Sequence, residues 1–596
     1  MIFLWDYPRI KYVAGQVMKR KTNIFLLLLL TMVYGLPAVA QTTKWWNPAT
    51  NAFPVISGQA WPAEVTQPYD RLPARAEKEV TSHVWYLSHQ AAGLAIRFSA
   101  NAPTITVRYT VKGDLAMPHM PSTGVSGVDL YAINKHGGWE WTAGGYSFKD
   151  TITYNFINLG TDTREYRLYL PLYNNVSWME IGVPDNATFK PIPARKEKPI
   201  VIYGTSIAQG GCASRPGLAW TAFLERMMDR EVINLGFSGN GKLDPPVADL
   251  LTEIDAKIYV LDCLPNLAAA DVKERVIKTV QTLRKKRPAV PILLADHSGE
   301  SIHSLNTAME EIFSNANKAL REAYTALKAM NISNLYLLPA AEMNIGREGT
   351  VDGVHPNDIG MERYAIAYEK AIRKILHETI DTSFSTTQPC RQNRDAGTYD
   401  WESRHNELLT ANKQSAPKVV FLGNSITHYW GGEPKAPIAR SEDSWQKMLA
   451  PLGVRNFGFG NDRIENVLWR IYHDELDGFD ASHVVMLIGT NNLAHNTDKE
   501  IIAGLRLLVT GIQQRQPKAK ILLSGLLPRT GMETRITNIN KAIAMLARPL
   551  GVTYIQPGKV FTLPNGKIDT RLFSDGLHPN DAGYQKLAAY LAPLLK

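Results

Sequence analysis

Cysteine is scarce in this sequence, and charge bias is small. Only three cysteines, Cys212, Cys263 and Cys390, occur in 596 residues, so the chain has no disulfide framework. Cys212 and Cys263 could pair with each other, or they could be two small buried thiols. The formal net charge is +9 without a basic tail or stripe, which argues against a nucleic-acid partner.

Metal-ligand and phosphate-binding patterns are missing too. No cluster in the sequence has metal-ligand spacing, and no stretch resembles a phosphate-cradling loop. We therefore expect no metal and no other cofactor. The composition, 45% hydrophobic and 20% charged, is that of an ordinary globular protein. A chain of 596 residues is too long for one hydrophobic core and should divide into several domains.

A long apolar run occurs near the N-terminus. Lys19-Arg20-Lys21 precedes the run Ile24–Leu30, and Ala38-Val39-Ala40 follows it. This order is typical of a secretory signal peptide, and the run is too short to span a bilayer as a stable anchor. We expect residues 1–40 to be removed on export to the periplasm or exterior of a Gram-negative bacterium. Their removal would lower the net charge to +5 and leave no integral membrane segment.

Residues 41–195 have the pattern of a β domain. Runs such as Ile105–Val111 and Tyr166–Leu170 alternate apolar and polar residues, and clusters of Gly, Pro, Asn and Asp separate them. Many short strands predict a β sandwich or jelly roll.

Two stretches of α/β character follow. Residues 196–378 contain short apolar runs at 200–203, 258–261, 290–295 and 335–338 with helical stretches between them, which predicts a parallel sheet covered on both faces. Residues 379–414 are a polar linker followed by an amphipathic helix from Tyr399 to Asn412. The α/β pattern begins again in residues 415–596. The expected fold is therefore multidomain, a β sandwich followed by two flavodoxin-like α/β domains.

The second α/β stretch repeats the first. Three segments recur in unchanged order at offsets of 219, 222 and 223 residues. The matched segments are 200–206 with 419–425, 234–239 with 456–461, and 352–357 with 575–580.

The repeated segments carry the residues of a serine nucleophile and its base. A serine hydroxyl is a poor nucleophile until a base takes its proton, and a carboxylate that fixes the tautomer improves that base. Each copy has a serine after its first strand, Ser206 or Ser425. Each also has an Asp-x-x-His segment that can present acid and base from one loop, Asp352 with His355 or Asp575 with His578.

These segments resemble the blocks of the SGNH (GDSL) hydrolase superfamily. The first block resembles Gly204–Ile207 and Gly423–Ile426, and the last resembles the two Asp-x-x-His segments. The resemblance implies a catalytic triad of Ser, His and Asp in each copy, and an oxyanion hole made by one residue of the second block and one of the third. The implied oxyanion residues are Gly239 and Asn266 in the first copy, and Asn461 and Asn491 in the second.

The copies depart from the family pattern at a few positions. Thr205 and Asn424 stand where the family has an Asp that is not part of its catalytic machinery. Asn461 replaces the oxyanion glycine. The asparagine keeps a backbone N–H but allows fewer backbone conformations than glycine. Pro265 beside Asn266 leaves the alignment of that asparagine open by one residue.

Each copy also resembles a narrower group. The second copy is similar to the catalytic subunits of platelet-activating-factor acetylhydrolase Ib, in segments that include Val467–Arg470 and Gly489–Asn492. The β region and the first copy resemble a bacterial pairing of a GxDLY domain with an SGNH hydrolase, because Gly127–Tyr131 reads Gly-Val-Asp-Leu-Tyr and Ser214–Gly217 is typical of it.

Four further features could contribute to the sites. His297 could line the first site or cap a loop, and we favour the first reading slightly. His428 could sit at the rim of the second pocket. Tyr429-Trp430 could form a sugar platform or pack in the core. Arg215 could pair with a carboxylate of the substrate or with a neighbouring loop.

The family resemblance implies a carboxylic-ester hydrolase, and the signal-peptide pattern predicts that it is exported. We expect it to remove acetyl or other short acyl groups from a carbohydrate. Export, the β accessory domain and aromatic residues near both sites favour a carbohydrate, and the sequence has no long apolar lid segment for a lipid chain. The partner would then be an acetylated glycan. Alternatives are a phospholipid or platelet-activating-factor-like acylhydrolase, a general short-chain esterase, and a glycan-binding protein without catalysis. We also expect the two copies to act on different substrates.

Overall fold

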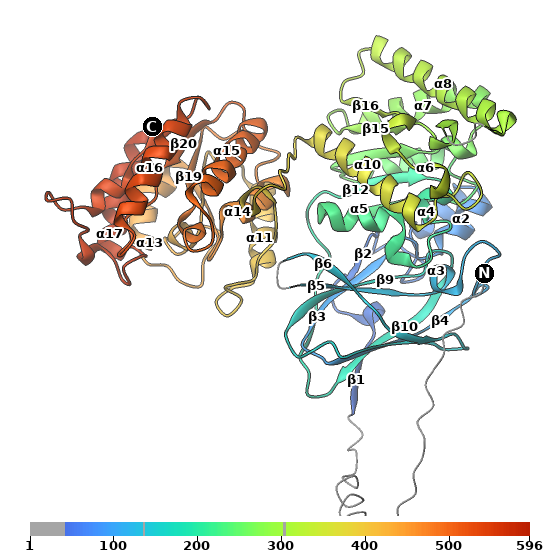
Figure 1. Ribbon diagram of the computed structural model, residues 1–596, viewed down its shortest axis with the longest axis horizontal. Helices are drawn as coiled ribbons and strands as arrows, with labels where there is room; N and C mark the ends of the chain where they lie inside the picture. Colours follow the sequence, from blue (N-terminus) through green and yellow to red (C-terminus); the bar gives the residue numbers. More distant parts are fainter. Residues whose placement is uncertain (1–41, 135–136, 302–304) are drawn as a thin grey trace, which may run out of the picture.

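The computed structural model describes residues 42–134, 137–301 and 305–596. The predicted signal peptide, residues 1–40, lies outside these ranges. Within them the chain forms an antiparallel β sandwich and then two α/β domains with parallel sheets, as the sequence predicts (Figure 1). No helix of the described residues is long and apolar enough to cross a membrane.

The β sandwich has two antiparallel sheets. The first has the order β1 (Thr43–Trp46), β10 (Val176–Pro184), β4 (Thr104–Val111), β8 (Ile152–Ile157) and β7 (Gly145–Ser147). The second has the order β11 (Phe189–Pro191), β3 (Ala95–Ala100), β9 (Arg164–Tyr169), β5 (Asp129–Ile133) and β6 (Trp139–Thr142), and β2 (Ile56–Ser57) pairs with β3. Alternate residues of β4 are buried between the sheets, which explains its alternating sequence.

One segment within the range expected for the β domain packs elsewhere. A 3₁₀ turn (Ala74–Lys78) and helix α2 (Ser82–Ser88) follow β2 and leave the sandwich. Leu72, Val84 and Leu87 are buried together with Leu251 of the first α/β domain. In Figure 1, α2 accordingly lies beside α4 and α6 of that domain. This segment therefore belongs to the core of the first α/β domain.

The two α/β domains have the same strand order. The first sheet runs β13 (Val232–Gly236), β12 (Ile200–Gly204), β14 (Ile258–Asp262), β15 (Ile292–Ala295), β16 (Leu335–Leu338). The second runs β18 (Val454–Gly458), β17 (Val419–Gly423), β19 (His483–Leu487), β20 (Lys520–Ser524), β21 (Thr553–Ile555). All five residues of β12 and of β17 are buried, as expected for central strands covered on both faces. The order is that of flavodoxin-like folds.

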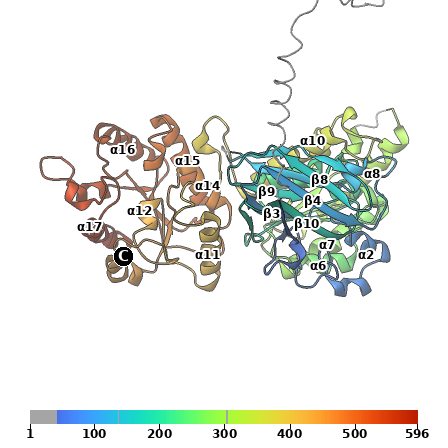
Figure 2. The ribbon, with the colours of Figure 1, turned by 90° about the horizontal axis from the view of Figure 1, so that it is seen from below.

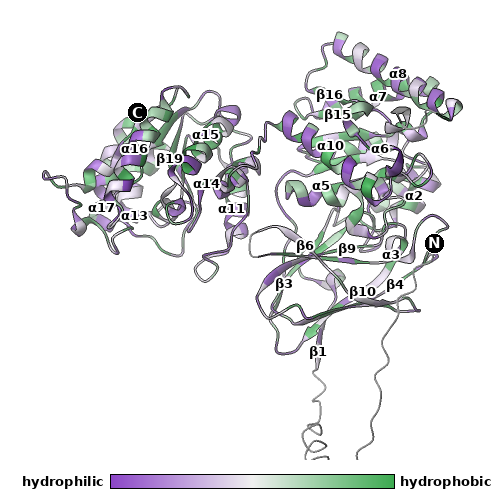
Figure 3. Cartoon of the chain, viewed as in Figure 1, coloured by the Kyte–Doolittle hydropathy of each residue, from purple (hydrophilic) through white to green (hydrophobic). Residues whose placement is uncertain are grey.

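Helices cover both faces of each sheet. In the first domain they are α4 (Ser206–Gln209), α5 (Trp220–Met228), α6 (Pro245–Leu251), α7 (Ala269–Lys286), α8 (Thr307–Ala329), α9 (Ala340–Met343) and α10 (Asp358–Leu376). In the second they are α11 (Trp401–Gln414), α12 (Ser425–His428), α13 (Glu442–Ser444), α14 (Ile464–Tyr472), α15 (Asp498–Arg515), α16 (Glu533–Ala547) and α17 (Asp581–Leu591). Figure 3 shows hydrophobic residues along the sheet strands and polar residues on the outer faces of helices such as α8.

A short helix, α3 (Ser122–Val125), lies in the sandwich beside the first α/β domain (Figure 1).

The segment expected to be a linker is packed against the second α/β domain rather than free of it. Thr386 and Thr387 are buried, and the hydroxyl of Thr386 donates to the carbonyl of Glu500 at 2.6 Å. Gln392 is also buried, at 9% exposure.

Buried ion pairs join the second α/β domain to the other two. Arg391 pairs with Glu165 of the sandwich and with Asp229 of the first α/β domain, both at 2.7 Å. Arg97 of the sandwich pairs with Glu402 of α11 at 2.7 Å. The second domain lies side by side with the sandwich in both ribbon views (Figures 1 and 2). These contacts fix the orientation of the second domain.

Candidate active sites

Each serine lies at the carboxyl end of the second strand in the sheet order. Ser206 is the first residue of α4, directly after β12, and Ser425 is the first residue of α12, directly after β17. Thr205 and Asn424 are the N-caps of these helices, and their side chains accept hydrogen bonds from Ile207 N–H and Ile426 N–H. Both residues therefore hold the turn that presents the serine. Ligand sites of such sheets gather at this edge.

The first serine is hydrogen-bonded to the predicted histidine. Ser206 Oγ lies 2.7 Å from His355 Nε2, and His355 Nδ1 lies 2.7 Å from Asp352 Oδ2. The other oxygen of Asp352 accepts from the backbone N–H groups of His355, at 2.8 Å, and Val354, at 3.0 Å. The Asp-x-x-His spacing thus closes a tight turn in which the carboxylate holds both the backbone and the ring of the histidine.

The second copy has the same arrangement. Ser425 Oγ lies 2.8 Å from His578 Nε2, and His578 Nδ1 lies 2.6 Å from Asp575 Oδ2. Asp575 Oδ1 accepts from His578 N–H at 2.7 Å and from Leu577 N–H at 3.0 Å. Both copies therefore bring together all three residues predicted as a triad, in the order that nucleophile activation requires.

The asparagine at the end of each repeated His-Pro-Asn sequence anchors the loop. Asn357 caps α10 by accepting from Gly360 N–H at 3.1 Å and donates to Glu348 O at 2.7 Å. Asn580 caps α17 in the same way, by accepting from Gly583 N–H at 3.1 Å and donating to Arg571 O at 2.7 Å.

Both loop carboxyls are held in the ionised form. Partial burial alone would raise the pKa of Asp352, but the hydrogen bonds from the backbone and ring of His355 and from Val354 N–H hold it below its usual range. The same balance of burial against hydrogen bonds from His578 and Leu577 lowers the pKa of Asp575 to about 2. Each histidine therefore faces a carboxylate that is ionised at neutral pH.

Gly239 and Asn461, the predicted oxyanion residues of the second block, have the same backbone conformation. Their φ angles are 68° and 59°, both in the left-handed region. A Cβ placed on Gly239 would meet no atom within 4 Å, and Asn is among the side chains that best tolerate this region. The replacement of glycine by Asn461 therefore leaves the loop backbone unchanged.

Two neighbouring side chains support these loops. Oε1 of Gln209 accepts from Ser238 N–H, and Nδ1 of His428 accepts from Gly460 N–H, each at 3.0 Å. His428 is only 1% exposed, so it does not lie at the rim of the second pocket. Gln209 is not among the residues predicted from the sequence, although Gln209 and His428 each lie three residues after a serine, a spacing that could have indicated an equivalent role.

The third-block asparagines occupy equivalent positions. β12 pairs Gly204 with Asp262, and β17 pairs Gly423 with Leu487. Asn266 and Asn491 each follow that paired residue by four positions, which supports the alignment of Asn266 with Asn491. Their hydrogen bonds differ, however. Asn266 Oδ1 accepts from Gly241 N–H at 3.1 Å, whereas Asn491 donates to Asp462 O at 2.9 Å. Asn266 keeps two amide N–H donors for a ligand, and Asn491 keeps one.

The sandwich borders the first site. The hydroxyl of Tyr173 donates to the carbonyl of Ser206 at 3.3 Å, and the exposed ring of His119 lies 6.4 Å from the ring of His355. In the second copy the preceding segment takes a similar place, because Arg394 donates to the carbonyl of Asn461 at 2.9 Å.

The Gly-x-Asp-Leu-Tyr sequence clamps the sandwich to the first α/β domain. Asp129 is buried and accepts from Arg215, at 2.5 Å, from Gly217 N–H, at 3.0 Å, and from Trp141 Nε1, at 2.5 Å. Arg215 also donates to the hydroxyl of Tyr131 at 2.8 Å. Arg215 therefore pairs within the protein, as the second of its two interpretations predicts, and not with a carboxylate of the substrate.

The other residues with alternative interpretations are also part of the protein core. His297 is 1% exposed, stacks on Phe313 at 4.1 Å and accepts from Gly299 N–H, so the favoured reading as a lining residue is wrong. Trp430 is fully buried and Tyr429 is 5% exposed, which leaves no sugar platform. Cys212 and Cys263 are buried, and both are free thiols.

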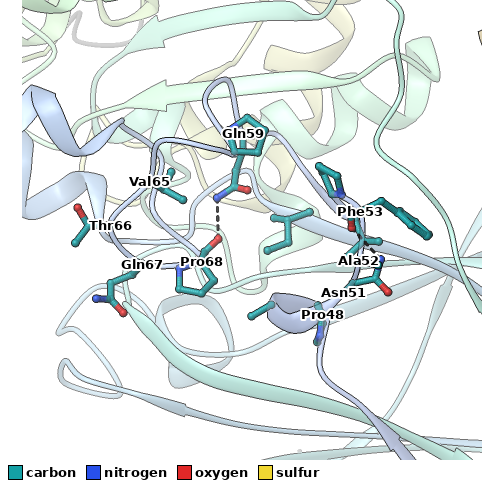
Figure 4. Close-up of a pocket in the computed structure, with 14 residues that line it drawn as sticks. Pro48, Asn51, Ala52, Phe53, Gln59, Val65, Thr66, Gln67 and Pro68 are labelled. Atoms are coloured by element: carbon teal, nitrogen blue, oxygen red, sulfur yellow. Dashed lines mark hydrogen bonds between the residues drawn. The ribbon is translucent and has the colours of Figure 1, made fainter.

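A separate hollow of about 360 Å³ lies in the N-terminal part of the sandwich. Its walls include Phe53, Gln59 and Pro68, and the amide of Gln59 donates to Pro68 O at 2.8 Å (Figure 4). None of the triad or oxyanion residues lines it.

Comparisons with known proteins match all three parts of the chain. Residues 197–373 and 421–586 each match the GDSL-like lipase/acylhydrolase family, and residues 43–189 match the GxDLY family, the N-terminus of SGNH-hydrolase-type esterases. The human platelet-activating factor acetylhydrolase IB subunit alpha2 is 30% identical over 200 residues, which are 33% of this chain and 83% of that protein. The human alpha1 subunit is 29% identical over 200 residues, 33% of this chain and 82% of that protein.

A solved structure is similar over more than half of the chain. A putative GDSL-like lipase from Bacteroides ovatus is 35% identical, covers 56% of this chain and 98% of its own, and has a TM-score of 0.53. The chain therefore belongs to the GDSL-like lipase/acylhydrolase, or SGNH hydrolase, family and carries two copies of its domain. It is a member of a family of esterases and acylhydrolases.

Proposed function

We propose that this protein is an exported serine esterase with two working sites that removes acetyl groups from a carbohydrate. The observation that supports it most is the pair of Ser–His–Asp arrangements. In each, the serine is hydrogen-bonded to the histidine and the histidine to the aspartate. Because both copies keep this geometry, we propose that both are catalytic.

The proposed reaction has two steps. Ser206 Oγ attacks the ester carbonyl while His355 Nε2 takes its proton, and Asp352 stabilises the resulting imidazolium. The oxyanion receives hydrogen bonds from Gly239 N–H and the Asn266 amide. Its collapse expels the alcohol, which receives the proton from His355, and leaves an acetyl-enzyme. Water, deprotonated by the same histidine, then releases acetate.

In the second copy Ser425, His578 and Asp575 take the same parts. Asn461 N–H and the remaining amide donor of Asn491 bind the oxyanion.

Exposed aromatic rings on the sandwich favour a carbohydrate as the substrate. The sandwich that borders the first site exposes the aromatic rings of Trp141, 49% accessible, and Tyr146, 57% accessible, and aromatic faces are common contacts for sugars. The exposed imidazole of His119 adds a polar group beside His355. A carbohydrate outside the cell agrees with the predicted signal peptide.

A phospholipid acylhydrolase is the second candidate, because the curated relatives are acetylhydrolases of platelet-activating factor by name. It predicts activity on acetylated phospholipids and little on acetylated glycans. A protein that only binds glycans would show affinity without turnover.

The test is acetate release from a panel of acetylated polysaccharides and one acetylated phospholipid. Wild type, Ser206→Ala, Ser425→Ala and the double variant are compared. We expect each single variant to lose part of the panel and the double variant to lose all of it. Full activity in the double variant would exclude both serines as nucleophiles.

A further inference from the structure

Two buried arginines from outside the repeated segments contact the same part of each α/β domain. Arg71 belongs to the segment between β2 and α2, and Arg404 belongs to α11 (Figure 1). Their exposed fractions are 1% and 3%. They come from unrelated local structures, a loop and a helix, and lie in no part of the sequence repeat.

Both guanidinium groups bind the carbonyls of the repeated Asn-x-Gly segment at the end of the edge strand. Arg71 donates to Asn234 O at 3.1 Å and to Gly236 O at 2.8 Å. Arg404 donates to Asn456 O at 3.3 Å and to Gly458 O at 2.8 Å.

The aromatic residue after each glycine lies under the guanidinium. Arg71 lies 5.0 Å from the ring centre of Phe237, and Arg404 lies 5.3 Å from that of Phe459. Phe237 precedes Gly239 by two residues, and Phe459 precedes Asn461 by two. The arginines therefore lie beneath the two loops that carry the proposed oxyanion N–H groups.

The asparagines extend this support to the serines. Asn234 donates to Ala208 O in α4 at 2.7 Å, and its Oδ1 accepts from Gly236 N–H at 2.8 Å. Asn456 repeats both contacts, with Thr427 O in α12 at 2.7 Å and Gly458 N–H at 2.8 Å. Each arginine is thus connected through one asparagine to the short helix that begins with the serine.

Neither arginine has a carboxylate within ion-pair distance among the described residues. The other donors of Arg71 bind the carbonyls of Gln90 and Leu87, and Nη1 of Arg404 binds Pro434 O. Burial lowers the pKa of Arg71 to about 9 and that of Arg404 to about 10, and both remain cationic at neutral pH. Carbonyl oxygens and the face of one phenylalanine ring therefore surround each charge.

We propose that Arg71 and Arg404 are equivalent positioning residues, each of which holds the oxyanion loop of its site through the Asn-x-Gly carbonyls and places a buried positive charge behind the oxyanion. The proposal rests on the proposed esterase function. A fixed charge in a low-dielectric interior favours the transition state, in which the negative charge develops, over the neutral substrate. The effect therefore falls on kcat rather than on KM.

The test isolates one site at a time with 4-nitrophenyl acetate as substrate. Arg71→Lys and Arg71→Gln are made in Ser425→Ala protein, and Arg404→Lys and Arg404→Gln in Ser206→Ala protein. Lysine keeps the charge but loses the forked hydrogen bonding, and glutamine keeps an amide donor but loses the charge. We expect kcat to fall about 10- to 100-fold, with KM nearly constant and glutamine more damaging than lysine.

A second readout separates catalysis from general damage. Phenylboronic acid forms a tetrahedral adduct with an active serine, so its inhibition constant should rise in parallel with the fall in kcat. Thermal unfolding and the activity of the same arginine variants in the opposite serine background report on folding, and we expect the other site to keep its kcat.

Arg230→Lys is the matched control. Arg230 is equally buried at 1%, lies just before β13, at the opposite end of the strand from Gly236, and pairs with Asp474 at 3.3 Å. We expect it to lower stability without changing kcat or boronate inhibition. Arginine variants that reduce kcat no more than Arg230→Lys would overturn the positioning role. Acetate release that persists in the Ser206→Ala, Ser425→Ala double variant would instead refute the proposed esterase sites.

Discussion

Gln209 and His428 make the same contact in the two copies. Each accepts a hydrogen bond at 3.0 Å from the backbone N–H that precedes the proposed oxyanion residue. Burial, with the nearby charges of Arg404 and Arg470, lowers the pKa of His428 to about 2, so its ring is neutral and can accept this bond. A glutamine and a neutral imidazole are thus interchangeable acceptors here.

This equivalence predicts the outcome of exchanging the two side chains. In Ser206→Ala protein, His428→Gln should keep kcat within about threefold, because the amide oxygen can accept the Gly460 bond. His428→Leu should reduce kcat by about tenfold or more, because it leaves a buried N–H unsatisfied at a cost of about 1–3 kcal/mol. Steady-state kinetics of the two variants check it, and equal losses would show that the acceptor is unimportant.

Neutralising either loop aspartate should remove most activity from its own site only. Asp352→Asn and Asp575→Asn keep the shape of the side chain, but the amide cannot stabilise a protonated histidine or fix its tautomer. We expect kcat to fall on the order of 10³- to 10⁴-fold. The measurement uses the background that lacks the other serine. Since both carboxyls have pKa values below the usual range, the acid limb of the pH profile should not arise from them.

Two glycines of the first oxyanion loop should respond differently to substitution. Gly239→Asn copies Asn461, keeps a tolerated left-handed φ and meets open space, so we expect a folded protein with kcat within about tenfold. A Cβ on Gly241 would lie 2.1 Å from Gly204 O, in the strand that presents Ser206. Gly241→Ala should therefore lose stability and activity together. Thermal unfolding and kcat in Ser425→Ala protein distinguish the two, and similar behaviour would contradict the loop geometry.

The sequence predicted the parts of both sites that repeat, and missed those that act through the main chain. Ser206, His355 and Asp352 occur at characteristic spacings, and buried strands such as β12 are nearly continuous apolar runs. Arg71 and Arg404 leave no such signal, because their partners are carbonyls that any residue can supply. The sequence also does not predict the packing of α2 against the first α/β domain, because the short apolar pattern of α2 does not specify which core it enters.

The ion-pair network between the domains should depend strongly on Asp229. Its carboxylate binds Arg391 at 2.7 Å, Arg195 at 3.0 Å and the indole N–H of Trp469 at 3.0 Å. Burial opposes its ionisation, but the arginines outweigh burial and hold its pKa well below the usual range.

Asp229→Ala would remove the carboxylate that these two arginines share, although Arg391 keeps its pair with Glu165 and Arg195 its pair with Glu197. It should lower the free energy of unfolding by up to about 3–5 kcal/mol. The control is Asp480→Ala, which removes the exposed pair with Lys518 at 2.8 Å and should change little. Denaturant unfolding measures both. Because the pKa of Asp229 is depressed, its contribution is present above the unfolded-state pKa and is lost as the pH falls toward the folded one. Equal effects of the two substitutions would show that the network carries no special stability.

Glu231 should make the contact between the sandwich and the first α/β domain sensitive to pH. Its Oε1 accepts from Gly58 N–H at 2.5 Å. Burial raises its pKa to about 7 from an ordinary value of 4.5, against the effect of the Gly58 bond and with help from Glu225 and Glu197. The folded protein therefore binds this proton more tightly than the unfolded chain does, so stability falls as the pH rises from about 4.5 to about 7.

Glu231→Gln removes the titration and keeps a side-chain oxygen that can accept the Gly58 bond. The difference in unfolding free energy between wild type and Glu231→Gln should therefore shift in favour of the variant between about pH 5 and about pH 8. Asp262 and Asp462, whose pKa values burial raises in the same direction, contribute equally to both proteins and cancel in this difference. Parallel pH profiles of the two proteins would mean that Glu231 is already ionised when the domain contact forms.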